Sequence, residues 1–112
     1  MARIENVLKR YNKDKKIYKI KDLEIDFDKR EVKSNGNIVY LTLKEYELFS
    51  LLLKNINIAL NREYILEKIW GIEKSMTIET RTVDFHIQQL RKKLNLRKEI
   101  VTISKIGYRL EI

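Results

Sequence analysis

The sequence predicts an α+β fold in which an antiparallel β-meander is followed by three helices and a C-terminal β-hairpin. Between residues 17 and 41, apolar and polar residues alternate with the period of a half-buried strand. Between residues 42 and 94 the apolar residues recur at helical spacing, and residues 100–112 return to short strand-like runs. A chain of 112 residues is long enough for one hydrophobic core, so we expect one small domain.

The meander is expected to consist of short strands joined by tight turns. Its strands should lie at residues 23–27, 31–33 and 37–41. The Asp28-Lys29 region can turn the first pair. Asn35-Gly36 favours a type I′ hairpin turn, because both central positions of that turn need a positive φ angle. We expect one face of the meander to pack against the helices that follow.

Two helices should follow the meander. Thr42 and Glu45 form a T-x-x-E capping box, in which each side chain accepts a backbone N–H of the other residue. A helix is therefore predicted over residues 43–54. After a short strand-like stretch at residues 58–60, Asn61 can cap a second helix, and Gly71 suits the left-handed position that ends it.

A third helix is predicted over residues 81–94, and its two faces differ. One apolar stripe runs along it at helical spacing, formed by Val83, Ile87, Leu90 and Leu94. At 100° per residue, the opposite side carries Arg81, Phe85, Gln88, Gln89 and Lys92, with Asp84 and Arg91 on its flanks. This side combines hydrogen-bonding groups for base edges, an apolar ring and cations for phosphates, which suits the major groove of DNA. An ordinary solvated helix face is the alternative.

Composition narrows the classes of function. The chain has no cysteine and one histidine, which excludes a cysteine nucleophile or thiolate metal site and leaves no convincing Ser/His triad or zinc site. We therefore expect no catalytic residues, no metal and no cofactor, with a small nuclease built on Arg, Lys and Glu as the enzymatic alternative. Met1 is not followed by a secretory signal or a long apolar run, which favours a cytoplasmic protein without membrane contact.

The charge of the chain suggests a polyanionic partner. The formal net charge is +8, with an isoelectric point near 9.7. Basic residues exceed acidic ones in residues 1–16 and again in residues 81–98, whereas residues 17–80 are nearly balanced. The second excess coincides with the third helix.

Three helices, the third basic and amphipathic, followed by a hairpin, describe a winged helix-turn-helix with the hairpin as the wing. Residues 18–112 resemble the DNA-binding effector domain of OmpR/PhoB-type response regulators through LTLKEYELFSLLL, NREYILEKIWG, RTVDFHIQQLRKKL and the final IGYRL. The N-terminal ARIENVLKRY resembles the last helix of the receiver domain in that family. Residues 1–16 are thus interpreted as the end of a receiver domain with its linker, and 17–112 as the winged-helix domain of a fragment.

The resemblance implies sequence-specific binding of double-stranded DNA to regulate transcription in a two-component phosphorelay. The third helix would lie in the major groove and the wing near the minor groove. Two domains would bind direct-repeat half-sites about one helical turn apart. In the full-length protein a sensor kinase would phosphorylate the receiver domain and so pair the molecules.

Residue roles follow from the same resemblance. Contacts to phosphates are implied for Arg81, Thr82, His86 and Arg91, contacts to bases for Asp84, Phe85 and Gln89, and anchoring of the wing to the DNA backbone for Thr102 and Tyr108. Gln88 and Lys92 share the exposed face with them. His86 lies closer to the apolar stripe, so a half-buried structural histidine is an equal alternative.

The chain departs from the family at positions that bear on specificity. It has Gln88 and Gln89 where many relatives carry arginines, and Phe85 where they carry valine. Glutamine can pair with adenine and a ring can contact thymine methyls, so we expect A·T pairs under Gln89 and Phe85. In the wing, Ser104-Lys105 replaces the common Arg-Gly step, so Lys105 would supply the minor-groove charge.

The sequence is also compatible with partners other than a specific DNA site. Residues 71–79, GIEKSMTIE, are read as a loop that resembles the segment by which relatives contact RNA polymerase, although a flexible connector explains the same residues. The alternatives for the whole chain are a winged-helix protein-interaction module and a non-specific nucleic-acid binder.

Overall fold

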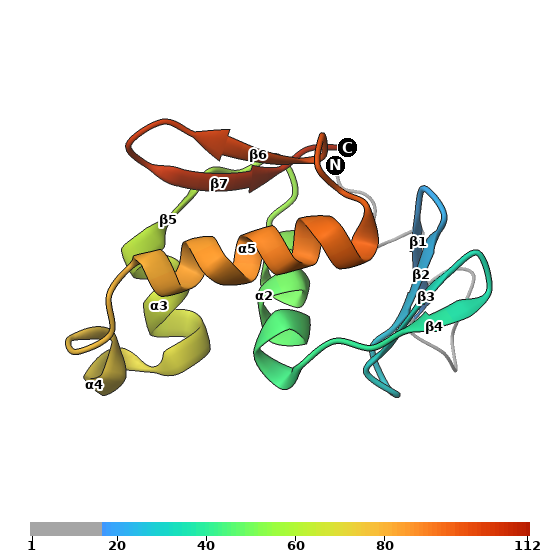
Figure 1. Ribbon diagram of the computed structural model, residues 1–112, viewed down its shortest axis with the longest axis horizontal. Coiled ribbons are helices and arrows are strands. Elements are labelled where there is room, and N and C mark those ends of the chain that lie inside the picture. The colour runs from blue at the N-terminus through green and yellow to red at the C-terminus, as the bar shows by residue number, and fades with distance from the viewer. Residues whose placement is uncertain (1–16) are drawn as a thin grey trace. The chain divides into compact units, whose positions relative to one another are not determined.

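The computed structural model describes residues 17–112, which fall into two compact units. The first unit ends at Tyr40, and the second comprises Leu41–Ile112 (Figure 1). The predicted receiver-end helix and linker at residues 1–16 lie outside the described residues.

The first unit is a four-stranded antiparallel sheet in the order β1-β2-β3-β4. Its strands are β1 (Ile17–Ile20), β2 (Leu23–Asp26), β3 (Glu31–Ser34) and β4 (Asn37–Val39). The carboxylate of Asp26 accepts the backbone N–H groups of Asp28 and Lys29, which fixes the turn between β2 and β3. Asn35 and Gly36 both have positive φ angles, 52° and 84°, as a type I′ turn requires. The predicted meander is therefore confirmed, with β1 as an additional strand.

The second unit begins with the two predicted helices, α2 (Leu43–Lys54) and α3 (Arg62–Trp70). The capping box of α2 is complete, since Thr42 and Glu45 exchange both side-chain-to-backbone hydrogen bonds. Asn61 caps α3 by accepting the backbone N–H of Tyr64 at 2.7 Å. Gly71 ends α3 with φ 96° and ψ 155°, so its φ is positive as expected but its ψ lies outside the left-handed helical region.

A one-turn helix interrupts the segment that the sequence predicts to be a loop. This element, α4, comprises Ile72–Ser75. Its four residues are too few for helical periodicity to be recognised in the sequence. The rest of the segment up to α5 (Arg81–Leu94) is irregular, and α5 has the predicted bounds.

The wing, the hairpin of β6 (Ile100–Ile103) and β7 (Gly107–Leu110), pairs with a further strand. The two-residue strand β5 (Leu60–Asn61) runs antiparallel to β7, so the sheet order is β5-β7-β6. A Cβ atom on Gly107 would lie 2.0 Å from the carbonyl oxygen of Leu60, so this close approach requires glycine. The strand that leads into α3 is thereby joined to the wing.

The core of the second unit lies beneath α5. The predicted stripe is buried, and Figure 1 shows α5 crossing α2 and α3 with the wing along its side. The stripe consists of Val83, Ile87, Leu90 and Leu94. Within residues 17–112, no helix is long and apolar enough to cross a membrane. The predicted α+β winged helix-turn-helix is the observed architecture.

Candidate nucleic-acid interface

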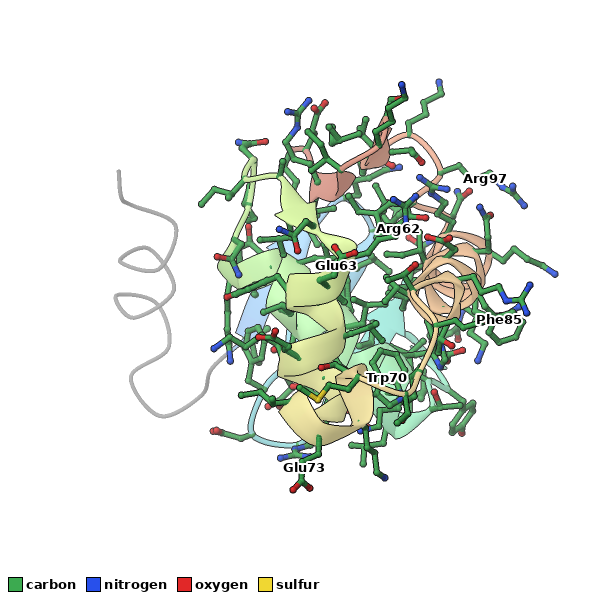
Figure 2. All side chains as sticks on the ribbon, turned by 90° about the vertical axis from the view of Figure 1, so that its left-hand side faces the viewer. Arg62, Glu63, Trp70, Glu73, Phe85 and Arg97 are labelled. Carbon is green, nitrogen blue, oxygen red and sulfur yellow. The ribbon has the colours of Figure 1, made fainter. Side chains whose placement is uncertain are left out.

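The outward face of α5 has the predicted orientation. Phe85 is 60% exposed although it lies between buried residues of the same helix. In Figure 2 its ring points away from α3. Other side chains of this face are exposed or half-buried: Arg81, Thr82, Asp84, His86, Gln88, Gln89, Arg91 and Lys92. The surface therefore offers one apolar ring among amides and cations.

Three side chains from different elements meet at one carboxylate. The hydroxyl of Tyr108 in β7 donates to Oδ1 of Asp84 at 2.5 Å, and Nε of Arg62 in α3 donates to the same oxygen at 2.8 Å. The Arg62 guanidinium also lies over the Tyr108 ring, 5.4 Å from its centroid. We call Arg62, Asp84 and Tyr108 the Asp84 cluster, which joins α3, α5 and the wing.

The members of the Asp84 cluster shift one another's pKa values. Partial burial alone would raise the pKa of Asp84, but hydrogen bonds from Tyr108 and Arg62 outweigh it and hold that pKa below its ordinary value. Burial, reinforced by the bond to Asp84, raises the pKa of Tyr108. The hydrogen bond to Asp84 raises the pKa of Arg62. At neutral pH a carboxylate is therefore bound by a neutral phenol and a guanidinium.

A second arginine fastens the wing to α5. Arg91 donates to the carbonyl oxygen of Ile100 through Nε at 3.0 Å and Nη2 at 2.6 Å, and to Oγ1 of Thr102 at 2.9 Å. Its guanidinium lies 5.6 Å from the centroid of the Tyr108 ring. Arg91 and Thr102, both predicted DNA contacts, thus form a hydrogen bond with each other at the protein surface.

The internal bonds change how some predicted contacts are understood. Tyr108 is only 3% exposed, so its ring belongs to the core and its hydroxyl already has a partner. Asp84, Arg91 and Thr102 are likewise engaged within the protein. In these contacts the four residues position α5 and the wing. Direct contact of any of them with DNA stays a prediction.

His86 occupies a half-buried position beside two other rings. Its Nδ1 lies 2.8 Å from the carbonyl oxygen of Thr82. The imidazole makes edge contacts with Trp70, at 5.1 Å between centroids, and with Phe85, at 5.5 Å. This placement fits the structural alternative for His86, and its contact with a phosphate stays a prediction.

The cationic candidates at the ends of the interface are solvent-exposed. Arg81 at the start of α5 forms an exposed ion pair with Glu79. Lys105 is exposed at the tip of the wing, where its φ of 64° helps to close the hairpin.

Ile72 and Met76, in the segment predicted to contact RNA polymerase, expose apolar side chains.

Sequence reasoning missed residues that hold the interface in place. Arg62 lies 22 positions before its partner Asp84, and no local pattern links them. Glu45 was predicted as a helix cap, yet the structure also bonds its carboxylate to Lys93 of α5 at 2.6 Å. Among residues 17–112, no group of three or more His, Cys, Asp or Glu side chains could hold a metal ion.

Residues 36–110 match the family described as "Transcriptional regulatory protein, C terminal". The chain belongs to this family. It is 40% identical over 111 residues to the response regulator ArlR of Staphylococcus epidermidis, a match that covers 96% of this chain and 49% of ArlR. The chain thus spans about half the length of the curated relatives it matches.

Two solved structures extend the comparison. DrrB, an OmpR/PhoB homologue of Thermotoga maritima, is similar with a TM-score of 0.76 and 30% identity, covering 95% of this chain and 49% of DrrB. The DNA-binding domain of Klebsiella pneumoniae RstA, in complex with the RstA box, has a TM-score of 0.74 and 25% identity, covering 86% of this chain and 97% of that domain. The predicted OmpR/PhoB-type effector domain and its role in transcription regulation are confirmed.

Proposed function

We propose that this chain binds specific sequences of double-stranded DNA, with α5 in the major groove and the wing near the minor groove. The observation that carries the proposal is the outward face of α5, where exposed Phe85 lies among glutamines and cations while the opposite stripe is buried. An α-helix with such a face can enter the major groove and present these groups to base edges.

Phosphate binding would supply most of the affinity. Arg81, Lys92 and Lys105 are exposed cations at the two ends of α5 and at the tip of the wing. The pairing of Arg81 with exposed Glu79 is weak in solvent, so a phosphate can replace it. Thr82 and His86 are assigned to neighbouring phosphates. Each neutralised phosphate releases counterions, so binding should weaken steeply with salt.

Base contacts would supply the choice of sequence. Gln88 is exposed and Gln89 is half-exposed on the face that carries Phe85. A glutamine amide can bond both N6 and N7 of adenine, so we assign an A·T-rich half-site to this surface. Asp84 lies at the edge of the same face and would meet a base only alongside its bonds to Arg62 and Tyr108.

Regulation would come from parts of a longer protein. ArlR is a response regulator, and on this basis we propose a receiver domain, a sensor kinase and phosphorylation-dependent pairing on direct repeats. The exposed apolar side chains of Ile72 and Met76, within residues 71–79, would contact RNA polymerase. A cytoplasmic location is part of the proposal, since a DNA-binding regulator must reach its DNA.

The test is selection of duplexes from a random pool, followed by titration of the selected duplex and a scrambled one at several salt concentrations. We expect a preferred A·T-rich sequence and an affinity ratio above about 1,000. Lys92→Ala should lower the slope of log affinity against log salt by about 1, whereas Lys54→Ala on α2 should not. A ratio near one would instead identify a non-specific binder, and no binding at all would favour a protein-interaction module.

A further inference from the structure

The exposed ring of Phe85 is held in place by other aromatic groups. Its centroid lies 5.5 Å from that of His86, with an interplanar angle of 85°. His86 in turn contacts Trp70 at 5.1 Å and 76°. These edge-to-face geometries are the favourable ones for aromatic pairs. We call Trp70, His86 and Phe85 the aromatic ladder.

The inner end of the ladder is anchored to two other helices. Trp70 is the last residue of α3, and Lys44 of α2 lies over its ring at 5.7 Å. Lys44 Nζ also donates to the carbonyl oxygen of Ile69 at 2.8 Å, beside Trp70. The bond between His86 Nδ1 and the Thr82 carbonyl fixes the middle ring. Figure 2 shows Trp70 at the end of α3 and Phe85 projecting from α5.

A fixed exposed ring suits recognition of a small apolar group. Little side-chain freedom is lost when a pre-positioned ring binds, so its buried area is converted more fully into affinity. The residues one turn away on the same face, Arg81, Gln88 and Gln89, are polar, so Phe85 does not belong to a broad apolar patch of the kind that docks proteins. In the major groove the apolar group of this size is the C5-methyl of thymine.

We propose that the aromatic ladder makes Phe85 a reader of one thymine C5-methyl group, with Trp70 and His86 as positioning residues. This inference rests on the proposed DNA-binding function and narrows it to a chemical group. Trp70 acts only through the two outer rings. Its loss therefore weakens methyl recognition without changing the number of phosphates bound.

The first experiment replaces each thymine of the selected duplex by deoxyuridine, which removes only the methyl group. Burial of one methyl group corresponds to about a fourfold change in affinity, so one position should bind about three- to fivefold more weakly. We call the affinity for the thymine duplex divided by that for the uracil duplex the thymine-to-uracil ratio. In Phe85→Ala this ratio should be one at that position. A ratio of one at every position, or a position-specific ratio that survives Phe85→Ala, would overturn the inference.

The second experiment tests the positioning role. Trp70→Leu should reduce the thymine-to-uracil ratio at that position while leaving the salt slope unchanged. Tyr64→Leu is the matched control, because Tyr64 lies on α3 outside the ladder, under Lys68. Thermal unfolding checks that each variant is folded. Equal ratios for Trp70→Leu and Tyr64→Leu would overturn the positioning role.

Different results would contradict the aromatic ladder and the proposed DNA-binding function. If the selected duplex binds specifically but its thymine-to-uracil ratio is one at every position, the role of the aromatic ladder is contradicted and the proposed function stands. If selection yields no preferred duplex, both are contradicted.

Discussion

The Tyr108 hydroxyl and the Asp84 carboxylate, 2.5 Å apart, connect the wing directly to the helix assigned to the major groove. Arg62 bonds to the same carboxylate oxygen from α3. A single group thus fixes the angle between three elements. With α5 in the major groove and the wing near the minor groove, as proposed, the reading of the two grooves would be coupled, because α5 and the wing cannot turn independently without breaking these bonds.

Removal of the Tyr108 hydroxyl should loosen this connection. Tyr108→Phe keeps the buried ring and its two guanidinium neighbours but leaves Asp84 with one donor fewer. We expect the free energy of unfolding to fall by about 1 kcal/mol, measured by urea denaturation. Affinity for the selected duplex should fall as well. Tyr40→Phe is the control, because Tyr40 is 81% exposed, and an equal loss in both variants would refute the connection.

Acid should weaken the contact between α2 and α5. Burial alone would raise the pKa of Glu45, but hydrogen bonds from Lys93 and the Thr42 backbone outweigh it and lower that pKa below 4.5. A depressed folded-state pKa stabilises the protein fully above the unfolded value and loses this effect as the pH falls through the folded one.

The test of this pH dependence compares the wild type with Glu45→Gln. The difference between their free energies of unfolding should be constant from about pH 7 to pH 5 and shrink below about pH 4.5. Other carboxylates, including Asp84, titrate in both proteins and cancel in the difference. A difference that does not change with pH would contradict the assignment.

Gly107 should tolerate no side chain. In Gly107→Ala the new methyl group would meet the Leu60 backbone, so we expect a loss of about 3 kcal/mol or separation of β5 from β7. Gly36→Ala makes a useful comparison, since Gly36 has a positive φ but open space around it. It should lose only about 1 kcal/mol. Urea denaturation measures both, and equal losses would contradict the steric requirement for glycine at position 107.

Lys105 should act through charge. Its replacement by alanine keeps the same positive φ with similar strain, so stability should change little. The slope of log affinity against log salt should fall by about 1 in the variant. Lys54→Ala is again the control. If Lys105→Ala alters neither affinity nor salt dependence, the wing is merely structural.

Gln89 should discriminate one adenine. In Gln89→Ala the loss of a bidentate pair should cost about 1 to 3 kcal/mol at a single A·T position of the selected duplex. Replacement of that adenine by 7-deazaadenine, which lacks N7, should weaken the wild type but not the variant. A variant that still rejects the altered base as strongly as the wild type would exclude this assignment.

Local patterns account for the parts of the fold that the sequence predicts well. The bounds of α5 and α2 follow from a sustained apolar stripe and a capping box, both of which are short-range signals. Helix α4 has four residues, too few for a helical period to show. The strand-like stretch predicted at residues 58–60 overlaps the two-residue strand β5 only at Leu60. Tertiary contacts decide such short elements, and β5 exists because β7 lies against it.

The sequence predicts which side chains of the candidate site face outward, but not which residues they bond to. Helical geometry correctly places Phe85 outside and Ile87 inside. It cannot show that Asp84 bonds to Tyr108, because the two residues are 24 positions apart and meet only when the wing has formed. The same holds for Glu45 and Lys93, which are separated by 48 positions.

The pairing of β5 with β7 restricts where the chain can change length. An extra residue between β5 and α3 would separate Arg62 from Asn61, which is paired with Gly107 of β7, and would pull Arg62 away from Asp84. An extra residue beside Lys105 would fall in the turn between β6 and β7, outside the register pairs of the two strands. Natural variation in chain length should therefore concentrate at this turn, and an engineered insertion that lengthens the wing should be made there.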